Sequence, residues 1–132
     1  MFNHVHHLGI AVRDIDAAIK LYESIGGQLI GRELTVDGSV ELAMLDLGNG
    51  SRIEPISPHT PDSFLHRWLD ERGEGLHHVA YAVDDITATL ADLKAQGYRL
   101  IDEVPRPGFG GHLIAFIQPS STMGALWELV QD

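Results

Sequence analysis

Residues 6–15 read HHLGIAVRDI, and residues 77–86 read HHVAYAVDDI. The match continues beyond both segments, because the apolar positions that follow keep the i, i+3, i+4, i+7 spacing of an amphipathic helix. Asp14 and Asp85 precede these two stretches and are suited to accept backbone N–H bonds at a helix start. The chain therefore contains an internal repeat whose copies begin near residues 6 and 77.

Strand-like stretches complete each copy in the same order. Gly26 and Gly97 follow the two helices at equivalent positions, and turn-forming residues such as Asp37-Gly38 separate the strands. The sequence therefore predicts an α+β fold of two tandem βαβββ modules. The predicted strands are 5–12, 28–34, 40–47 and 51–56 in the first module, and 78–83, 98–101, 113–117 and 125–130 in the second.

With 132 residues, the chain is expected to form one domain, 1–132, large enough to bury a core. Module one covers about 4–57 and module two about 75–131. The connector between them, about 60–73, is predicted to be a helix that ends near Gly73. Its apolar side consists of Phe64, Leu65, Trp68 and Leu69.

The charge balance limits the partners. There are 9 Lys and Arg residues against 19 Asp and Glu residues, a formal net charge of −10, which argues against nucleic acid and anionic membranes. The absence of cysteine excludes disulfides, thiolate metal sites and a cysteine nucleophile. No segment reads as a membrane span or a signal peptide, so a cytoplasmic protein is expected.

The last strand of each module carries a glutamate in the same setting. Residues 50–54 read GSRIE, and residues 124–128 read GALWE. A carboxylate inside an otherwise apolar strand is costly unless it is paired or binds a metal. The two glutamates, Glu54 and Glu128, are therefore candidate metal ligands.

Histidines of the two first strands supply matching nitrogen donors. If a pseudo-twofold axis relates the modules, one histidine from each first strand and one glutamate from each last strand can converge. Two imidazoles and two carboxylates suit a divalent cation. Strand alternation places neighbouring side chains on opposite faces, so the pair is either His6 with His77 or His7 with His78.

Several segments resemble the vicinal oxygen chelate superfamily of glyoxalases, bleomycin resistance proteins and dioxygenases, and especially its methylmalonyl-CoA epimerase branch. They read HLGIAV at 7–12, GEGLHHVA at 73–80, AFIQP at 115–119 and ELV at 128–130. The resemblance implies a mixed sheet cupped around a central metal site, and frequently a homodimer. It implies one divalent ion (Co, Zn, Ni, Mn or Fe), with the ligands His7, Glu54, His78 and Glu128.

The same resemblance implies an epimerase or isomerase that removes a proton next to a carbonyl through a metal-stabilised enolate. The substrate would be methylmalonyl-CoA or a related 2-substituted acyl thioester. Glu128 and Glu54 would transfer protons. The branch also has a non-ligand glutamate between its second and third strands, and the nearest match here is Asp37, which could equally serve its Asp-Gly turn.

The sequence departs from the epimerase pattern near its end. The branch commonly reads GAHG where residues 108–111 read GFGG, so His112 either takes over the polar role or faces solvent. A lysine of the branch is replaced by Ser120, which weakens the case for a CoA thioester. Remaining cations that could contact the phosphates of CoA are Arg106, Arg52 and Lys20.

Two other functions fit the same fold. A lactoylglutathione lyase of the glyoxalase I type would use a similar site on a hemithioacetal. A small-molecule binding or resistance protein without catalysis would not need the four ligands. An Fe(II) dioxygenase fits less well, because its facial triad needs only one carboxylate.

Overall fold

The computed structural model describes residues 1–132, which form two compact units. The N-terminal unit consists of His7–His77, and the C-terminal unit consists of Met1–His6 together with His78–Asp132. The predicted modules differ from these units in one respect, because the first six residues pack with the second half of the chain. The segment between the modules belongs to the N-terminal unit.

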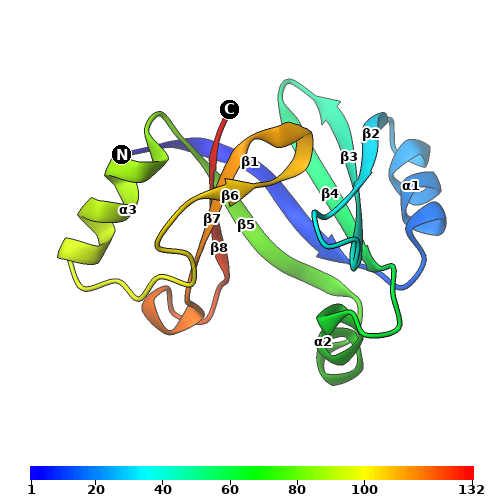
Figure 1. The fold of residues 1–132 in the computed structure, drawn as a ribbon. Coiled ribbons are helices and arrows are strands. Elements are labelled where there is room, and N and C mark those ends of the chain that lie inside the picture. Colours follow the sequence, from blue (N-terminus) through cyan, green and yellow to red (C-terminus); the bar gives the residue numbers. More distant parts are fainter. The chain divides into compact units, whose positions relative to one another are not determined.

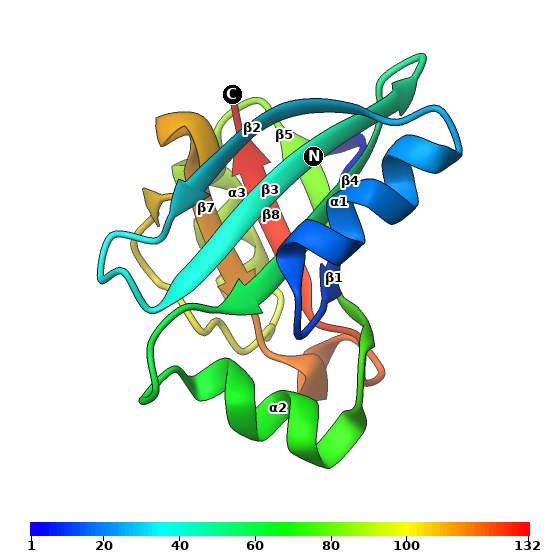
Figure 2. The same ribbon diagram turned by 90° about the vertical axis from the view of Figure 1, so that its right-hand side faces the viewer.

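The N-terminal unit contains a four-stranded sheet and two helices (Figures 1 and 2). Its strand order is β2-β3-β4-β1, in which β1 and β4 are parallel and the other pairs antiparallel. Strand β1 contributes only His7–Ala11 to this unit. The elements are β1 (Phe2–Ala11), α1 (Ile15–Ser24), β2 (Gln28–Leu34), β3 (Val40–Gly48), β4 (Ser51–Pro58) and α2 (Phe64–Arg72).

Two apolar clusters hold the helices of this unit against its sheet. Ile15 and Ile19 of α1 pack on Ala43 and Leu45 of β3. Strand alternation directs odd and even positions of β3 to opposite faces, so a second cluster lies on the face opposite α1. It consists of Ala11, Val40, Ile56, Leu65 and Leu69, the last two from α2.

The C-terminal unit repeats the arrangement with different strand lengths. Its strand order is β1-β5-β8-β7-β6, with β5 and β8 parallel and the β8–β7 and β7–β6 pairs antiparallel. Short 3-10 turns at Phe109–Gly111 and Pro119–Ser121 flank β7. The elements are β5 (Gly75–Val83), α3 (Ile86–Ala95), β6 (Arg106–Pro107), β7 (Leu113–Ile117) and β8 (Trp127–Gln131).

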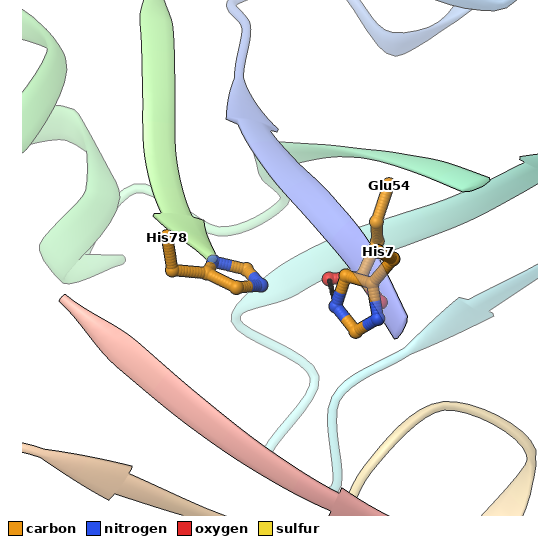
Figure 3. Close-up of side chains that lie close together, drawn as sticks. All are labelled: His7, Glu54 and His78. Atoms are coloured by element: carbon orange, nitrogen blue, oxygen red, sulfur yellow. Dashed lines mark ion pairs between the residues drawn. The ribbon is translucent and has the colours of Figure 1, made fainter. Parts of the chain in front are cut away.

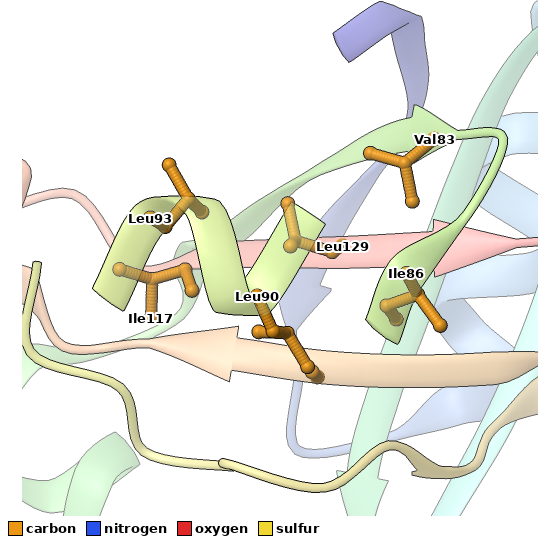
Figure 4. Close-up of a cluster of buried hydrophobic side chains, with 7 residues drawn as sticks. Val83, Ile86, Leu90, Leu93, Ile117 and Leu129 are labelled. Atoms are coloured by element: carbon orange, nitrogen blue, oxygen red, sulfur yellow. The ribbon is translucent and has the colours of Figure 1, made fainter. Parts of the chain in front are cut away.

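Helix α3 covers one face of this second sheet. Figure 4 shows Ile86, Leu90 and Leu93 of the helix beside Ile117 of β7 and Leu129 of β8. All five side chains are at most 3% exposed. Burial of such side chains is the main favourable term in folding, at roughly 1.5–3 kcal/mol for each.

The first strand closes an aromatic cluster in the same unit. The ring of Phe2 stacks on Tyr81 at a centroid distance of 5.0 Å and meets the edge of Trp127 at 5.8 Å. These contacts explain why the first residues belong to the C-terminal unit rather than to the module that follows them in the sequence.

The predicted α+β class and the order βαβββ in each half are confirmed. Both predicted N-caps are also observed, because Asp14 and Asp85 accept a hydrogen bond from the backbone N–H three residues later, at 3.1 and 3.0 Å. Gly26 and Gly97 both adopt φ of +98°, which glycine reaches without a steric penalty. None of the helices has the length and apolar character needed to span a lipid bilayer.

Two predictions for individual elements are wrong. Residues 98–101 do not form a strand, because only Leu100 makes a single bridge, to Ile117. Leu100 and Tyr98 instead pack on the core from an irregular segment. The connector helix begins at Phe64, where the Ser63 hydroxyl accepts the N–H of Leu65, rather than near residue 60.

Candidate metal centre

His7 and Glu54 lie on neighbouring parallel strands of the N-terminal unit. Gly9 of β1 is in register with Glu54 of β4, and His7 points to the same face as Gly9 because it lies two residues away. His7 Nε2 is 3.6 Å from Glu54 Oε1, the ion pair drawn dashed in Figure 3. Both side chains are at most 6% exposed, and both lie on the sheet face opposite α1.

His78 and Glu128 form the corresponding pair in the C-terminal unit. Ala80 of β5 is in register with Glu128 of β8, so His78 and Glu128 share a face. His78 Nε2 is 3.3 Å from Glu128 Oε2. The edge of the Phe116 ring meets His78 at a centroid distance of 5.7 Å, and this face is the one opposite α3.

The two pairs use the same construction. In each, the histidine lies two residues before the residue that is in register with the glutamate. His7, Glu54 and His78 are all buried, and their two imidazoles and one carboxylate could hold a metal ion (Figure 3). Buried nitrogen and oxygen donors of this kind fit a divalent transition metal.

Burial also sets the protonation of the donors. Burial, and to a lesser degree the charge of Glu33, raises the pKa of Glu54 from 4.5 to about 8. Burial lowers the pKa of His78, although the Glu128 charge opposes this shift. His78 is therefore a neutral imidazole near pH 7, the form that binds metals, whereas Glu54 must first lose a proton.

This difference predicts a proton release. At pH 7 the binding of a divalent ion should release about one proton from Glu54, because a ligating carboxylate must be deprotonated. Calorimetric titrations in two buffers of different ionisation enthalpy would count it. The Glu54→Gln variant, which keeps the side-chain shape, should release about one proton fewer. Equal release by both proteins would contradict the shifted pKa.

The metal-free protein should show the same shift in its stability. The unfolded chain ionises Glu54 at its ordinary pKa of 4.5, while the folded chain keeps the group neutral up to about 8. Because the unfolded state then binds fewer protons, the free energy of unfolding should fall as the pH rises through this window.

Glu33 is a site residue that the sequence did not indicate. It is in register with Leu42, which is in register with Ile56, two residues after Glu54. Glu33 therefore shares the face of Glu54, and its charge contributes to the raised pKa of that group. Only the pairing of β2 with β3 reveals this, since local alternation does not say which face of β2 is turned toward the ligands.

Asp37 lies in the turn between β2 and β3. Its Oδ1 accepts hydrogen bonds from the Ser39 N–H at 2.9 Å, the Ser39 hydroxyl at 2.8 Å and the Thr35 hydroxyl at 2.8 Å. These bonds, the backbone bond from Ser39 first, lower the pKa of Asp37. They favour the turn role over that of a general base, and a catalytic role for Asp37 stays a prediction.

The other histidines near the site have partners elsewhere. His6 Nε2 lies 3.1 Å from Asp132 Oδ1, and the His77 ring packs on Trp68 at 5.0 Å. His112 follows the 3-10 turn at 109–111, is 41% exposed, and places Nδ1 3.7 Å from the same Asp132 oxygen. The structure thus gives His6 and His77 packing and pairing contacts of their own, and His112 a half-exposed position.

The family model of the glyoxalase/bleomycin resistance protein/dioxygenase superfamily matches residues 6–116. The chain belongs to this superfamily, as its repeat and resemblance predicted.

Several relatives are similar along nearly the whole chain. An uncharacterized protein of Bacillus subtilis, YqjC, is 38% identical over 98% of this chain and 92% of its own length. The ethylmalonyl-CoA/methylmalonyl-CoA epimerase of Cereibacter sphaeroides is 31% identical over 99% of both chains. A variant of Streptomyces coelicolor methylmalonyl-CoA epimerase, solved in complex with 2-nitronate-propionyl-CoA, superposes with a TM-score of 0.92 at 33% identity, covering 100% of this chain and 99% of that one.

Proposed function

We propose that the protein is a metal-dependent epimerase acting on methylmalonyl-CoA or a related 2-substituted acyl thioester. The observation that carries the proposal is the presence of two buried His–Glu pairs at equivalent positions of the repeat, His7 with Glu54 and His78 with Glu128. Similarity to epimerases over nearly the whole chain supports the substrate class.

The four residues are proposed to hold one divalent ion, which is Co, Zn, Ni, Mn or Fe on the chemistry of the donors. When bound, the ion would supply Lewis acidity that polarises the thioester carbonyl and stabilises negative charge on its oxygen. Metal analysis of the purified protein, followed by titration of the metal-free form with each ion, identifies the preferred one.

Glu54 and Glu128 are the proposed proton-transfer groups, because they are carboxylates at equivalent places of the two modules. One accepts the proton as the C–H bond next to the carbonyl breaks and its electron pair passes into the enolate. The other, already protonated, returns a proton to the opposite face of the same carbon. The total number of protons is unchanged, and the two carboxyl groups exchange protonation states.

Isotope exchange tests the function directly. Metal-loaded protein incubated with methylmalonyl-CoA in deuterated water should incorporate deuterium at the α-carbon, as seen by mass spectrometry. No exchange above the level of a Glu128→Ala variant would overturn the proposal. Formation of an α-hydroxy thioester from methylglyoxal and a thiol would identify a lactoylglutathione lyase instead.

Homodimer formation and a cytoplasmic location are part of the same proposal. Both rest on the resemblance to the epimerase branch and on the composition of the chain. Light scattering coupled to size-exclusion chromatography would test the dimer, for which a mass of twice 14.5 kDa is expected.

A further inference from the structure

Arg106 lies beside the second ligand pair, on the same face of its sheet. It is in register with Ile114 of β7, which is in register with Val130, two residues after Glu128. Phe116, two residues after Ile114, is in register with Glu128 itself. Strand alternation therefore turns Arg106, Phe116 and Glu128 to one face, the face that also carries His78.

Contacts hold the guanidinium of Arg106 in place. It lies over the Phe116 ring, 5.1 Å from the centroid, and the edge of the same ring meets His78 at 5.7 Å. One aromatic ring thus separates the cation from a candidate metal ligand. A cation above an aromatic face is stabilised by the ring quadrupole.

A carboxylate fixes the orientation of this cation. Arg106 Nε is 3.2 Å from Asp102 Oδ1, and Asp102 Oδ2 also accepts the backbone N–H of Phe116 at 2.9 Å. The contacts of Arg106 therefore use its Nε and its flat face, while Nη1 and Nη2 make no hydrogen bond within the protein. The side chain is 53% exposed, so this end of the guanidinium is open to a ligand.

We propose that Arg106 binds the carboxylate of the acyl group of the substrate, and so selects carboxylated thioesters. Two parallel N–H donors match the two oxygens of a carboxylate, which makes arginine the preferred residue for this recognition. The position next to His78, rather than at a distance from the ligand pairs, favours the carboxylate near the reacting carbon over the phosphates of CoA. The inference rests on the proposed function.

The equivalent position in the other half of the repeat has the opposite charge. Glu33 has the same register relation to Glu54 that Arg106 has to Glu128. The repeat therefore supplies this cation once, and the proposed carboxylate contact belongs to the C-terminal unit alone. Substrate would bind in one orientation, although the ligand pairs are alike.

Binding measurements with two thioesters test the role of Arg106. Methylmalonyl-CoA and propionyl-CoA share the CoA moiety and differ by the carboxylate. In calorimetric titrations of metal-loaded protein, Arg106→Gln should weaken methylmalonyl-CoA binding roughly 10- to 100-fold, the loss of a charge-assisted bidentate pair. Propionyl-CoA binding should change less than about twofold. Arg106→Lys, which keeps the charge without the fork, should fall between wild type and Arg106→Gln.

Controls separate this proposal from its rivals. Arg67→Gln removes a charge from an exposed arginine of α2 and should leave both affinities unchanged. Equal weakening of both thioesters by Arg106→Gln would assign Arg106 to the CoA phosphates and overturn the proposal. Loss of the carboxylate preference in Arg52→Gln alone would overturn it too. Arg106-dependent binding without isotope exchange would instead contradict the epimerase function while supporting the carboxylate contact.

Discussion

Replacing either His7 or His78 with alanine should lower the affinity for a divalent ion by about 100-fold or more. Changes to groups that merely orient a ligand typically cost 10- to 100-fold, so loss of a direct ligand should exceed them. The two variants should lose similar amounts of affinity, because their histidines are buried to the same 3% and each lies beside one glutamate. Competition with a chromogenic chelator would measure both.

His4 provides the matched control for this experiment. It is an exposed histidine on the same strand as His7, so His4→Ala should bind metal like the wild type. Wild-type affinity in one of the two ligand variants would remove that histidine from the centre. Circular dichroism of each metal-free variant checks that the fold is retained.

Glu128→Gln should separate metal binding from proton transfer. The amide keeps an oxygen donor and the size of the side chain, so metal affinity should stay within about tenfold of wild type. Because an amide cannot accept the α-proton, the rate of deuterium incorporation should fall roughly 10²- to 10⁴-fold, the usual contribution of general acid–base catalysis. Glu54→Gln should have the same effect if the two carboxylates share the work.

Glu23→Gln on the exposed side of α1 is the control for the loss of one carboxylate, and it should exchange deuterium at the wild-type rate. Exchange by Glu128→Gln at more than a tenth of the wild-type rate would assign proton transfer to another group. Glu33, on the same face as Glu54, would then be the first residue to replace.

The sequence predicted those parts of the fold that depend on local chemistry. Both repeat helices begin at their aspartate caps and are followed by glycines of positive φ, because caps and glycine conformations are set by neighbouring residues. Residues 98–101 were mispredicted for the opposite reason. Tyr98 and Leu100 are apolar because they fill the core from an irregular segment, and burial alone does not distinguish that from a strand.

The candidate site divides in the same way. The glutamates and the two alternative histidine pairs follow from the repeat, and the resemblance selects His7 and His78. Glu33 and Arg106 could not be assigned to the ligand-bearing faces, because their orientation depends on pairing between strands that a single sequence does not show. Asp37 was proposed as a base from its place in the chain, whereas its bonds to Ser39 and Thr35 became evident only in the structure.

The contacts of Phe2 affect how the chain can fold during synthesis. Phe2 is among the first residues to leave the ribosome, yet its ring partners Tyr81 and Trp127 are made much later. The N-terminal end of β1 must therefore wait unpaired while the intervening residues are translated. Contacts between such distant parts of a chain slow folding, since a long loop must close before they form. A nascent chain that stops before β8 would expose this strand and its aromatic side chain to aggregation or to a chaperone.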